Sequence, residues 1–249
     1  MANRILVSGT KSGLGASLLN WLGTDSLTRT DNPADLWGRP AYDAIVHCAI
    51  DLTKDNSNPI TKNVALLHDV MRIPHRLFVQ ISSVDIYPNT KGKRREIDEL
   101  GAIPEDASYR AVKLACELAL RNTNKPNLVL RPTALLGKTA RPNSLIKMMH
   151  NPNCRLTLSP KSIFNYVRHR QISEFIKVAI RNGHVGIYNV ASTGNLRLDE
   201  IAAIVGARPE YGHYKYEVGD VDNSKAKAIF PDFSMTSAQT IAAFTKEIA

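Results

Sequence analysis

Long apolar segments are absent from this 249-residue sequence, in which no run approaches the ~20 apolar residues that a membrane-spanning helix needs. The N-terminus leads directly into a strand-like segment at residues 4–8, without the apolar core and cleavage site of a secretory leader. These absences predict a cytoplasmic protein that has no membrane partner.

Cysteine is scarce, with only Cys48, Cys116 and Cys154. An odd number of widely spaced cysteines without a C-x-x-C pair excludes a complete disulfide framework. No histidine stands near them at the spacing of a zinc site. We interpret all three as reduced packing residues and expect no metal centre.

The composition is otherwise that of an ordinary globular protein, with 43% hydrophobic and 22% charged residues and no internal repeat. The formal net charge of +9 suits nucleic acid, an anionic membrane or a phosphorylated small molecule. The densest basic run, at 91–95, lacks aromatic residues and is followed at once by acidic ones. We interpret it as a solvated loop, with a polyphosphate contact as the alternative, and expect no nucleic-acid partner.

Short apolar segments alternate with helical periodicities along the first half of the chain. This alternation predicts an α/β fold, a Rossmann-like doubly wound parallel sheet. We expect a dinucleotide-binding domain at 1–137, with the remaining sheet elements and a small substrate-binding subdomain at 138–249, as one structural unit. The predicted strands are 4–8, 26–29, 44–49, 77–82, 127–131 and 186–190, and the predicted helices are 14–22, 61–71, 109–122, 171–181, 198–205 and one from 236 onward.

A glycine-rich turn follows the first predicted strand and opens the first predicted helix. Glycines there permit a tight turn and let a pyrophosphate approach the backbone at the positive end of the helix dipole. An ordinary strand-to-helix turn is the alternative interpretation. The pattern predicts a dinucleotide site that includes Gly9, Lys11, Ser12, Gly13, Leu14 and Gly15.

The end of the second predicted strand indicates which dinucleotide binds. An acidic residue there would hold the ribose hydroxyls of NAD and repel a 2′-phosphate, but this sequence has Arg29. Arg29 and Lys11 are suited to binding that phosphate, although Asp31 lies only two residues further on. We therefore favour NADP over NAD.

A serine, a tyrosine and a lysine form a coherent group for proton transfer. Ser83 follows a predicted strand, and Tyr109 and Lys113 are four residues apart, on one face of a helix. A free phenol has a pKa near ~10, which a neighbouring ammonium group lowers. We predict that Tyr109 is the acid or base, that Lys113 activates it, and that Ser83 hydrogen-bonds the substrate oxygen.

With these motifs in this order, the sequence resembles the extended short-chain dehydrogenases/reductases, the NAD-dependent epimerase/dehydratase family that modifies nucleotide sugars. The resemblance implies that Arg131, Pro132 and Thr133 line the nicotinamide side of the pocket. It also implies that Asn63 supports the site from its helix. The motifs that carry the resemblance are the glycine turn, His47-Cys48-Ala49, Asn63-Val64, Ser83 with Tyr87, the Tyr109/Lys113 pair, the segments from Arg131 to Gly137 and from Phe164 to Val167, and Tyr188-Asn189-Val190, with Cys48 and Ala49 placed in the cofactor site.

The sequence departs from the family pattern at several points. The glycine spacing is that of the smaller single-domain branch, Gln171 replaces an acidic residue, and the connection between Arg29 and Ala44 is too short for a strand and a helix. The dehydratases of this family have an Asp-Glu pair directly after the catalytic Thr or Ser, but in this sequence Val84 and Asp85 follow Ser83, so the pair is broken. We interpret Asp85 as a solvated strand-end residue as readily as a site residue. Elimination chemistry is therefore not expected.

Two reactions remain, and we favour a reductase of a keto group over an epimerase that keeps NAD bound. The resemblance implies a nucleotide sugar as substrate, with Lys138, Arg141 and Lys147 as candidate contacts, and a homodimer through helices such as the one that carries Tyr109. A non-catalytic NADP-sensing regulatory protein is the alternative from another class. The intact Tyr109/Lys113 pair argues against it. Tyr87 and Tyr166 are interpreted as packing residues.

Overall fold

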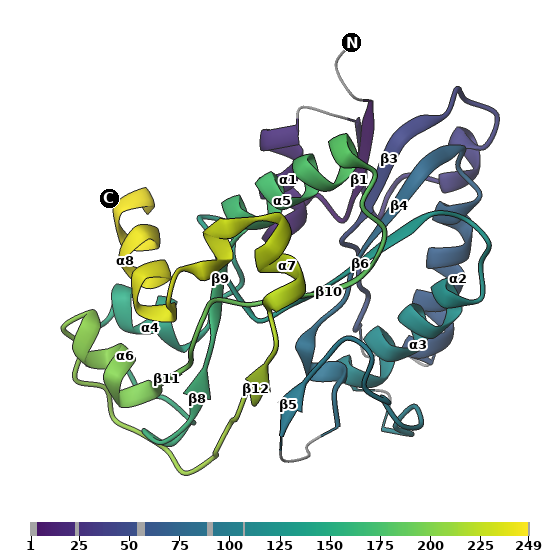
Figure 1. The fold of residues 1–249 in the computed structure, drawn as a ribbon. Helices are drawn as coiled ribbons and strands as arrows, with labels where there is room; N and C mark the ends of the chain where they lie inside the picture. Colours follow the sequence, from purple (N-terminus) through teal and green to yellow (C-terminus); the bar gives the residue numbers. More distant parts are fainter. Residues whose placement is uncertain (1–3, 23–24, 54–57, 89–91, 107, 249) are drawn as a thin grey trace.

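The computed structural model describes residues 4–22, 25–53, 58–88, 92–106 and 108–248. Its main feature is a six-stranded sheet in the order β10-β6-β4-β3-β1-β2, in which every neighbouring pair is parallel (Figure 1). The predicted doubly wound α/β fold is confirmed. The strands are β1 Ile5–Ser8, β2 Asp25–Leu27, β3 Tyr42–His47, β4 His75–Ile81, β6 Asn127–Pro132 and β10 Gly186–Val190.

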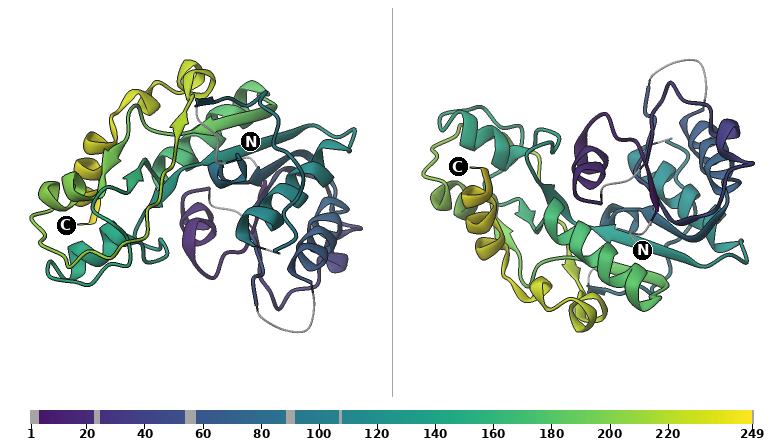
Figure 2. Two further views of the ribbon diagram at one scale, coloured as in Figure 1. Left: turned by 90° about the horizontal axis from the view of Figure 1, so that it is seen from below. Right: turned by 90° about the horizontal axis from the view of Figure 1, so that it is seen from above.

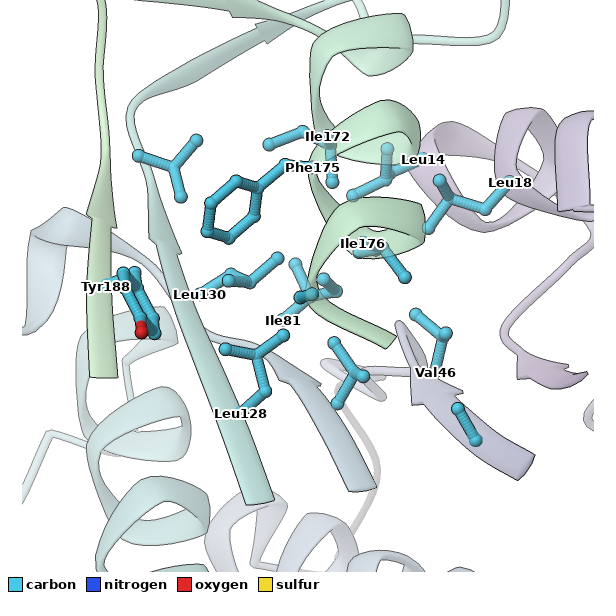
Figure 3. Close-up of a cluster of buried hydrophobic side chains, with 14 of the residues drawn as sticks. Leu14, Leu18, Val46, Ile81, Leu128, Leu130, Ile172, Phe175, Ile176 and Tyr188 are labelled. Atoms are coloured by element: carbon cyan, nitrogen blue, oxygen red, sulfur yellow. The ribbon is translucent and has the colours of Figure 1, made fainter. Parts of the chain in front are cut away.

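Two pairs of helices cover the sheet. Helices α1 (Gly13–Leu22) and α5 (His169–Asn182) lie on one face, and α2 (Pro59–Met71) and α3 (Tyr109–Arg121) lie on the other (Figure 1). Because successive strand residues point to opposite faces, the central strands β1, β3, β4 and β6 contribute to the apolar cores on both faces of the sheet. Figure 3 shows the first core, where Leu14 and Leu18 of α1 and Phe175 of α5 pack over apolar residues of the strands.

The connection from β2 to β3 is shortened, as the sequence predicts. It contains a single 3₁₀ turn, η1 (Pro33–Leu36), in which Asn32 accepts a hydrogen bond from the backbone of Ala34. Strand β2 ends at Leu27, two residues earlier than predicted. Arg29 therefore lies in the turn after the strand, at the edge where ligands bind in this fold.

The second half of the chain adds α5 and β10 to the main sheet and contributes most of a smaller part beside it. Figure 2 shows this part gathered to one side of the sheet. It has an apolar core of its own. Its helices are α4 (Ser144–His150), α6 (Leu198–Ile204) and α8 (Ser237–Ile248), and its short strand pairs are β7/β9 (Ala134–Leu136 with Tyr166–Arg168) and β8/β11 (Ile163–Phe164 with Leu196–Arg197). Helix α7 (Ser224–Ile229) and the 3₁₀ turn η3 (Pro231–Ser234) pack instead against the first core, next to β10. Strand β12 (Asp220–Val221) pairs with β5 (Lys93–Arg94) from the first half of the chain.

The basic run at 91–95 is not a simple solvated loop, and that interpretation is wrong for its central residues. Lys93 and Arg94 form β5, and the buried Arg94 guanidinium donates to the carbonyl of Val218 at 2.6 Å. Lys91 lies outside the described residues. None of the described helices combines the length and the apolar character that crossing a membrane requires.

Candidate active site

A cavity of about 1050 Å³ opens at the carboxyl ends of β1, β3, β4 and β6. The lining residues come from the glycine turn, the loops after β2 and β3, the segment after β4, the start of α3 and the segment that follows β6. In doubly wound sheets this edge holds the ligand. Its size lies at the upper end of ordinary small-molecule sites, as two ligands bound together would require.

The glycine turn is shaped for close backbone approach. Gly9 has a φ of 75°, and a Cβ there would lie 2.7 Å from the backbone nitrogen of Ala49. A Cβ on Gly15 would overlap the carbonyl oxygen of Gly9. All of the residues predicted for the turn line the cavity, at the amino end of α1. The residues present therefore fit the pyrophosphate of a dinucleotide.

The end of β3 forms a neutral wall next to the turn. The Nδ1 of His47 is hydrogen-bonded to the Ser8 hydroxyl at 2.8 Å, and burial, together with the charge of Lys113, lowers the pKa of His47 to about 3. Burial raises the pKa of Cys48 to about 12. Cys48 and Ala49 line the cavity as predicted, and both side chains are uncharged at neutral pH.

Charged groups of both signs surround the far end of the cavity, beyond β2. Arg29, whose side chain is 71% exposed, lies 3.7 Å from an oxygen of Asp51, and Lys62 lies 3.4 Å from the other. The Oδ2 of Asp31 accepts hydrogen bonds from the backbone nitrogen and the hydroxyl of Thr28 at 2.7 and 2.8 Å. These bonds lower the pKa of Asp31, so its carboxylate is charged and helps to hold the turn at residues 28–31, after β2.

Asn63 does not line the cavity but supports its wall. Its side chain accepts a hydrogen bond from the backbone nitrogen of Asp51 at 2.8 Å and donates to the carbonyls of Asp51 and Pro59 at 2.6 and 2.7 Å. The amide thereby fixes the loop after β3 to the start of α2. Its predicted place in the cofactor site is thus indirect.

Ser83, Tyr109 and Lys113 meet in the same cavity. Ser108 caps α3 by accepting a hydrogen bond from the backbone of Ala111, which places Tyr109 at the first helical position. Tyr109 is 36% exposed to solvent and lines the cavity. The buried Lys113 ammonium donates to the carbonyl of Ile81 at 2.6 Å and lies 5.7 Å from the centroid of the Tyr109 ring.

This arrangement provides the parts of a proton-transfer site. An ammonium group has three donors, and the contact with Ile81 uses one, so two remain for the cavity. A positive charge that is held by buried backbone stabilises a phenolate nearby. Tyr109 can therefore give or take a proton at a substrate oxygen, which Ser83 can hydrogen-bond.

Asp85 and Tyr216 also belong to this site. Asp85 accepts hydrogen bonds from the hydroxyls of Ser83 and Tyr216 at 3.3 and 3.0 Å, and both Asp85 and Tyr216 line the cavity. Of the two interpretations that the sequence left open for Asp85, these contacts favour a residue of the site over a solvated strand-end residue. Its position two residues after Ser83 could have suggested its role. Tyr216 stands in no recognisable motif, and no sequence signal could have identified it.

Arg131 was expected beside the nicotinamide, and this expectation is wrong. Its side chain is fully buried on the face of β6 that packs under α3, where it pairs with Glu117 and donates to the Tyr87 hydroxyl at 2.7 Å. Pro132 and Thr133 do line the cavity.

Only some of the remaining predicted residues line the cavity. Of the candidate substrate contacts Lys138, Arg141 and Lys147, only Arg141 lines the cavity. Tyr87 and Tyr166 are buried outside it, as expected of packing residues. Gln171, at the position of the family's acidic residue, accepts a hydrogen bond from the backbone of Arg168 at 2.8 Å and so caps the start of α5.

A parallel sheet with a glycine turn after β1, and a Tyr/Lys pair on α3 facing the same cavity, defines a dinucleotide-binding protein of the short-chain dehydrogenase class. Residues 16–191 match the model of the NAD dependent epimerase/dehydratase family. The chain belongs to this family. A search of curated proteins finds no match.

Solved structures with this fold include several enzymes that act on sugar nucleotides. UDP-N-acetylglucosamine 4-epimerase from Bacillus cereus has a TM-score of 0.76 and 18% identity, with 99% of each chain covered. A dTDP-4-dehydrorhamnose reductase from Clostridium acetobutylicum has a TM-score of 0.77 and 14% identity, with 98% of this chain and 99% of that chain covered. A dTDP-glucose 4,6-dehydratase from Bacillus anthracis, solved with NAD, has a TM-score of 0.72 and 16% identity, with 99% of this chain and 97% of that chain covered. At these identities the likeness shows the shared fold.

Proposed function

We propose that this protein is a reductase that uses NADPH to reduce a keto group of a nucleotide-activated sugar. The observation that carries the proposal is the convergence of Ser83, Tyr109 and Lys113 on the cavity that also holds the glycine turn. When bound, the dinucleotide supplies the hydride. Tyr109 supplies the proton for the substrate oxygen, Lys113 stabilises the phenolate left behind, and Ser83 hydrogen-bonds that oxygen.

The preference for NADPH is supported by the charges beyond β2. The carboxylates of Asp31 and Asp51 already have partners within the protein, since Asp31 closes the turn with Thr28 and Asp51 faces Arg29 and Lys62. The Arg29 side chain is largely exposed, and its ion pair is long, at 3.7 Å. A ribose 2′-phosphate can therefore recruit Arg29 at small cost, because an exposed ion pair contributes little.

An epimerase with tightly bound NAD is the second candidate, and the same two carboxylates favour it. Asp31 and Asp51 both line the cavity, where either could accept hydrogen bonds from free ribose hydroxyls. The affinities of the Arg29→Ala variant for NADPH and NADH distinguish the reductase from the epimerase. Under the NADPH proposal this variant loses affinity for NADPH and keeps its affinity for NADH. Equal binding of both dinucleotides, unchanged in the variant, contradicts the proposal.

The direct test of function is the loss of reduced-nicotinamide absorbance when the protein and NADPH meet a panel of nucleotide-linked keto sugars. We expect turnover with a member of the panel, and none above background for Tyr109→Phe. No turnover across the panel, combined with interconversion of sugar epimers, would establish the epimerase. Dinucleotide binding without either activity would indicate a regulatory protein.

A cytoplasmic location and a homodimer stay predictions. Helix α3, the proposed dimer contact, has Tyr109 and Arg121 as its exposed residues, and its apolar side chains are buried or partly buried within the chain. A dimer through α3 would therefore depend on polar contacts. Sedimentation of the wild type and of Arg121→Glu tests it.

A further inference from the structure

A chain of hydrogen bonds joins the glycine turn to two segments from the second half of the protein. The Thr139 hydroxyl lies 2.6 Å from the carbonyl oxygen of Gly13 and 2.8 Å from the Ser17 hydroxyl. The Ser17 hydroxyl in turn lies 2.8 Å from Nδ1 of His169. Thr139 follows β7, Ser17 is on α1 and His169 begins α5, so three separate elements meet at this point.

The direction of each hydrogen bond follows from counting protons. A carbonyl oxygen only accepts, so Thr139 donates its single proton to Gly13. Thr139 can then only accept from Ser17, which uses the one proton of Ser17. His169 must therefore donate from Nδ1 to Ser17. The imidazole is neutral, because burial lowers the pKa of His169 to about 4. We call this chain of hydrogen bonds from His169 through Ser17 and Thr139 to Gly13 the relay, and each of its donors has one acceptor.

The packing around His169 is equally specific. His169 is 1% exposed, and a Cβ on Gly137 would overlap its ring. The absence of a side chain at Gly137 thus allows residues 137–143 to lie directly against α5 and α1. The segment is fixed at two places, by Gly137 against His169 and by Thr139 on Gly13.

Arg141 lies on this fixed segment and lines the cavity. It is two residues after Thr139, so its Cα is within ~7 Å of the Cα of Thr139, whose hydroxyl contacts the glycine turn. The guanidinium group can therefore reach the turn. Arg29 and Lys62, which also line the cavity, already face Asp51, whereas Arg141 has no ion pair among the residues that the structure describes.

We propose that the Thr139–Ser17–His169 relay holds residues 137–143 on the glycine turn and places Arg141 against the diphosphate of the bound dinucleotide. Arg141 then serves the cofactor rather than the substrate, and the second half of the chain completes the cofactor site. A guanidinium group is suited to this, since it forms paired, charge-assisted hydrogen bonds with phosphate oxygens. The inference rests on the proposed function only in assuming that a nicotinamide dinucleotide binds.

The test measures dissociation constants of NADPH, ADP-ribose and AMP by titration of the intact protein. For Arg141→Ala we expect NADPH and ADP-ribose, which contain the diphosphate, to bind about 10-fold more weakly, the size of one lost charge-assisted hydrogen bond. AMP should change less than about 2-fold on the same reasoning. Lys138→Ala is the matched control, because Lys138 is an exposed cation of the same segment that does not line the cavity.

The relay is tested through its coupling to Arg141. Thr139→Val removes the hydroxyl and should weaken NADPH binding, and Thr139→Ser should restore it. If Thr139 acts by placing Arg141, the double variant Thr139→Val/Arg141→Ala binds NADPH no more weakly than Arg141→Ala alone. Additive losses would overturn the role of the relay.

Two other results would overturn the inference or its premise, and they are distinguishable. If the wild type binds NADPH and Arg141→Ala binds it equally well, Arg141 does not contact the cofactor, and a raised KM for substrate alone would assign it to the substrate. If the wild type binds neither NADPH nor NADH, the proposed function itself is wrong.

Discussion

The buried ion pair of Glu117 and Arg131 permits a quantitative prediction. Both side chains are fully buried, and the Glu117 carboxylate also accepts hydrogen bonds from Ser82 at 2.9 Å and Arg121 at 2.7 Å. Glu117→Gln keeps the shape and removes the charge, which leaves the Arg131 guanidinium uncompensated. Breaking such a pair costs about 3–5 kcal/mol in the free energy of unfolding. With an unfolding entropy of ~2.1 cal/mol/K per residue over 249 residues, Tm should fall by about 6–10 °C.

Urea and thermal unfolding, followed by circular dichroism, measure this loss. Arg121→Gln is the control, because Arg121 pairs with the same carboxylate but has a side chain that is 38% exposed. This variant should lose less than about 1 kcal/mol in the free energy of unfolding. Replacing Glu117 and Arg131 together by methionine should recover much of the stability, since an apolar pair of similar size needs no compensation. A Glu117→Gln variant as stable as Arg121→Gln would refute the reasoning.

Three further predictions follow from the site. Under the proposed mechanism, in which the Lys113 ammonium supports proton transfer by Tyr109, Lys113→Met should lower kcat by about 10²-fold or more with a normal melting curve. Gly137→Ala should weaken NADPH binding and lower Tm, because a Cβ there overlaps the His169 ring, while Gly38→Ala, where a Cβ meets open space, should change neither. Burial lowers the pKa of His47 to about 3 and that of His169 to about 4, so the unfolded chain binds protons first as the pH falls below 6.5. The stability present above pH 6.5 should decline by up to about 1.4 kcal/mol per pH unit for each histidine down to pH 4. Urea titrations at several pH values give the free energy of unfolding, which should depend less steeply on pH in His169→Gln than in the wild type.

The fold was predictable because its signals are local. Strand β10 has the predicted bounds, Gly186–Val190, and α1 and α3 begin within a residue of the predicted positions. Apolar periodicity and turn residues determine such elements over short stretches of sequence. The bounds of β2 were predicted less well, since three residues at the edge of a sheet carry little periodicity. Because β2 ends at Leu27, Arg29 lies in the turn after the strand and not in the strand itself.

The site was predictable only where its residues share a motif. Ser83, Tyr109 and Lys113 stand at recognisable spacings, and the structure brings them together. Tyr216 is 131 residues from its partner Asp85, and His169 is 152 residues from Ser17. Contacts at such separations arise from the packing of whole elements, which no local pattern encodes.

The error over Arg131 has a related cause. A strand segment that leads toward a ligand site does not fix which face each side chain takes. Arg131 shares the face of Val129, which packs in the core under α2 and α3, and the carboxylate of Glu117 is the partner on that face. Only the position of α3 over the strand decides this, and that position depends on the whole sheet.

The way in which the two halves share one core predicts that they do not fold separately. Residues 1–137 would lack β10 and α5, and Ile172, Phe175 and Ile176 of α5 fill the core against α1 and the strands (Figure 3). Without α5 the fragment exposes that face of the sheet, an apolar patch that isolated domains rarely tolerate. Circular dichroism and urea titration of the 1–137 fragment should show no cooperative unfolding. A cooperative transition would mean that the first half is stable without α5.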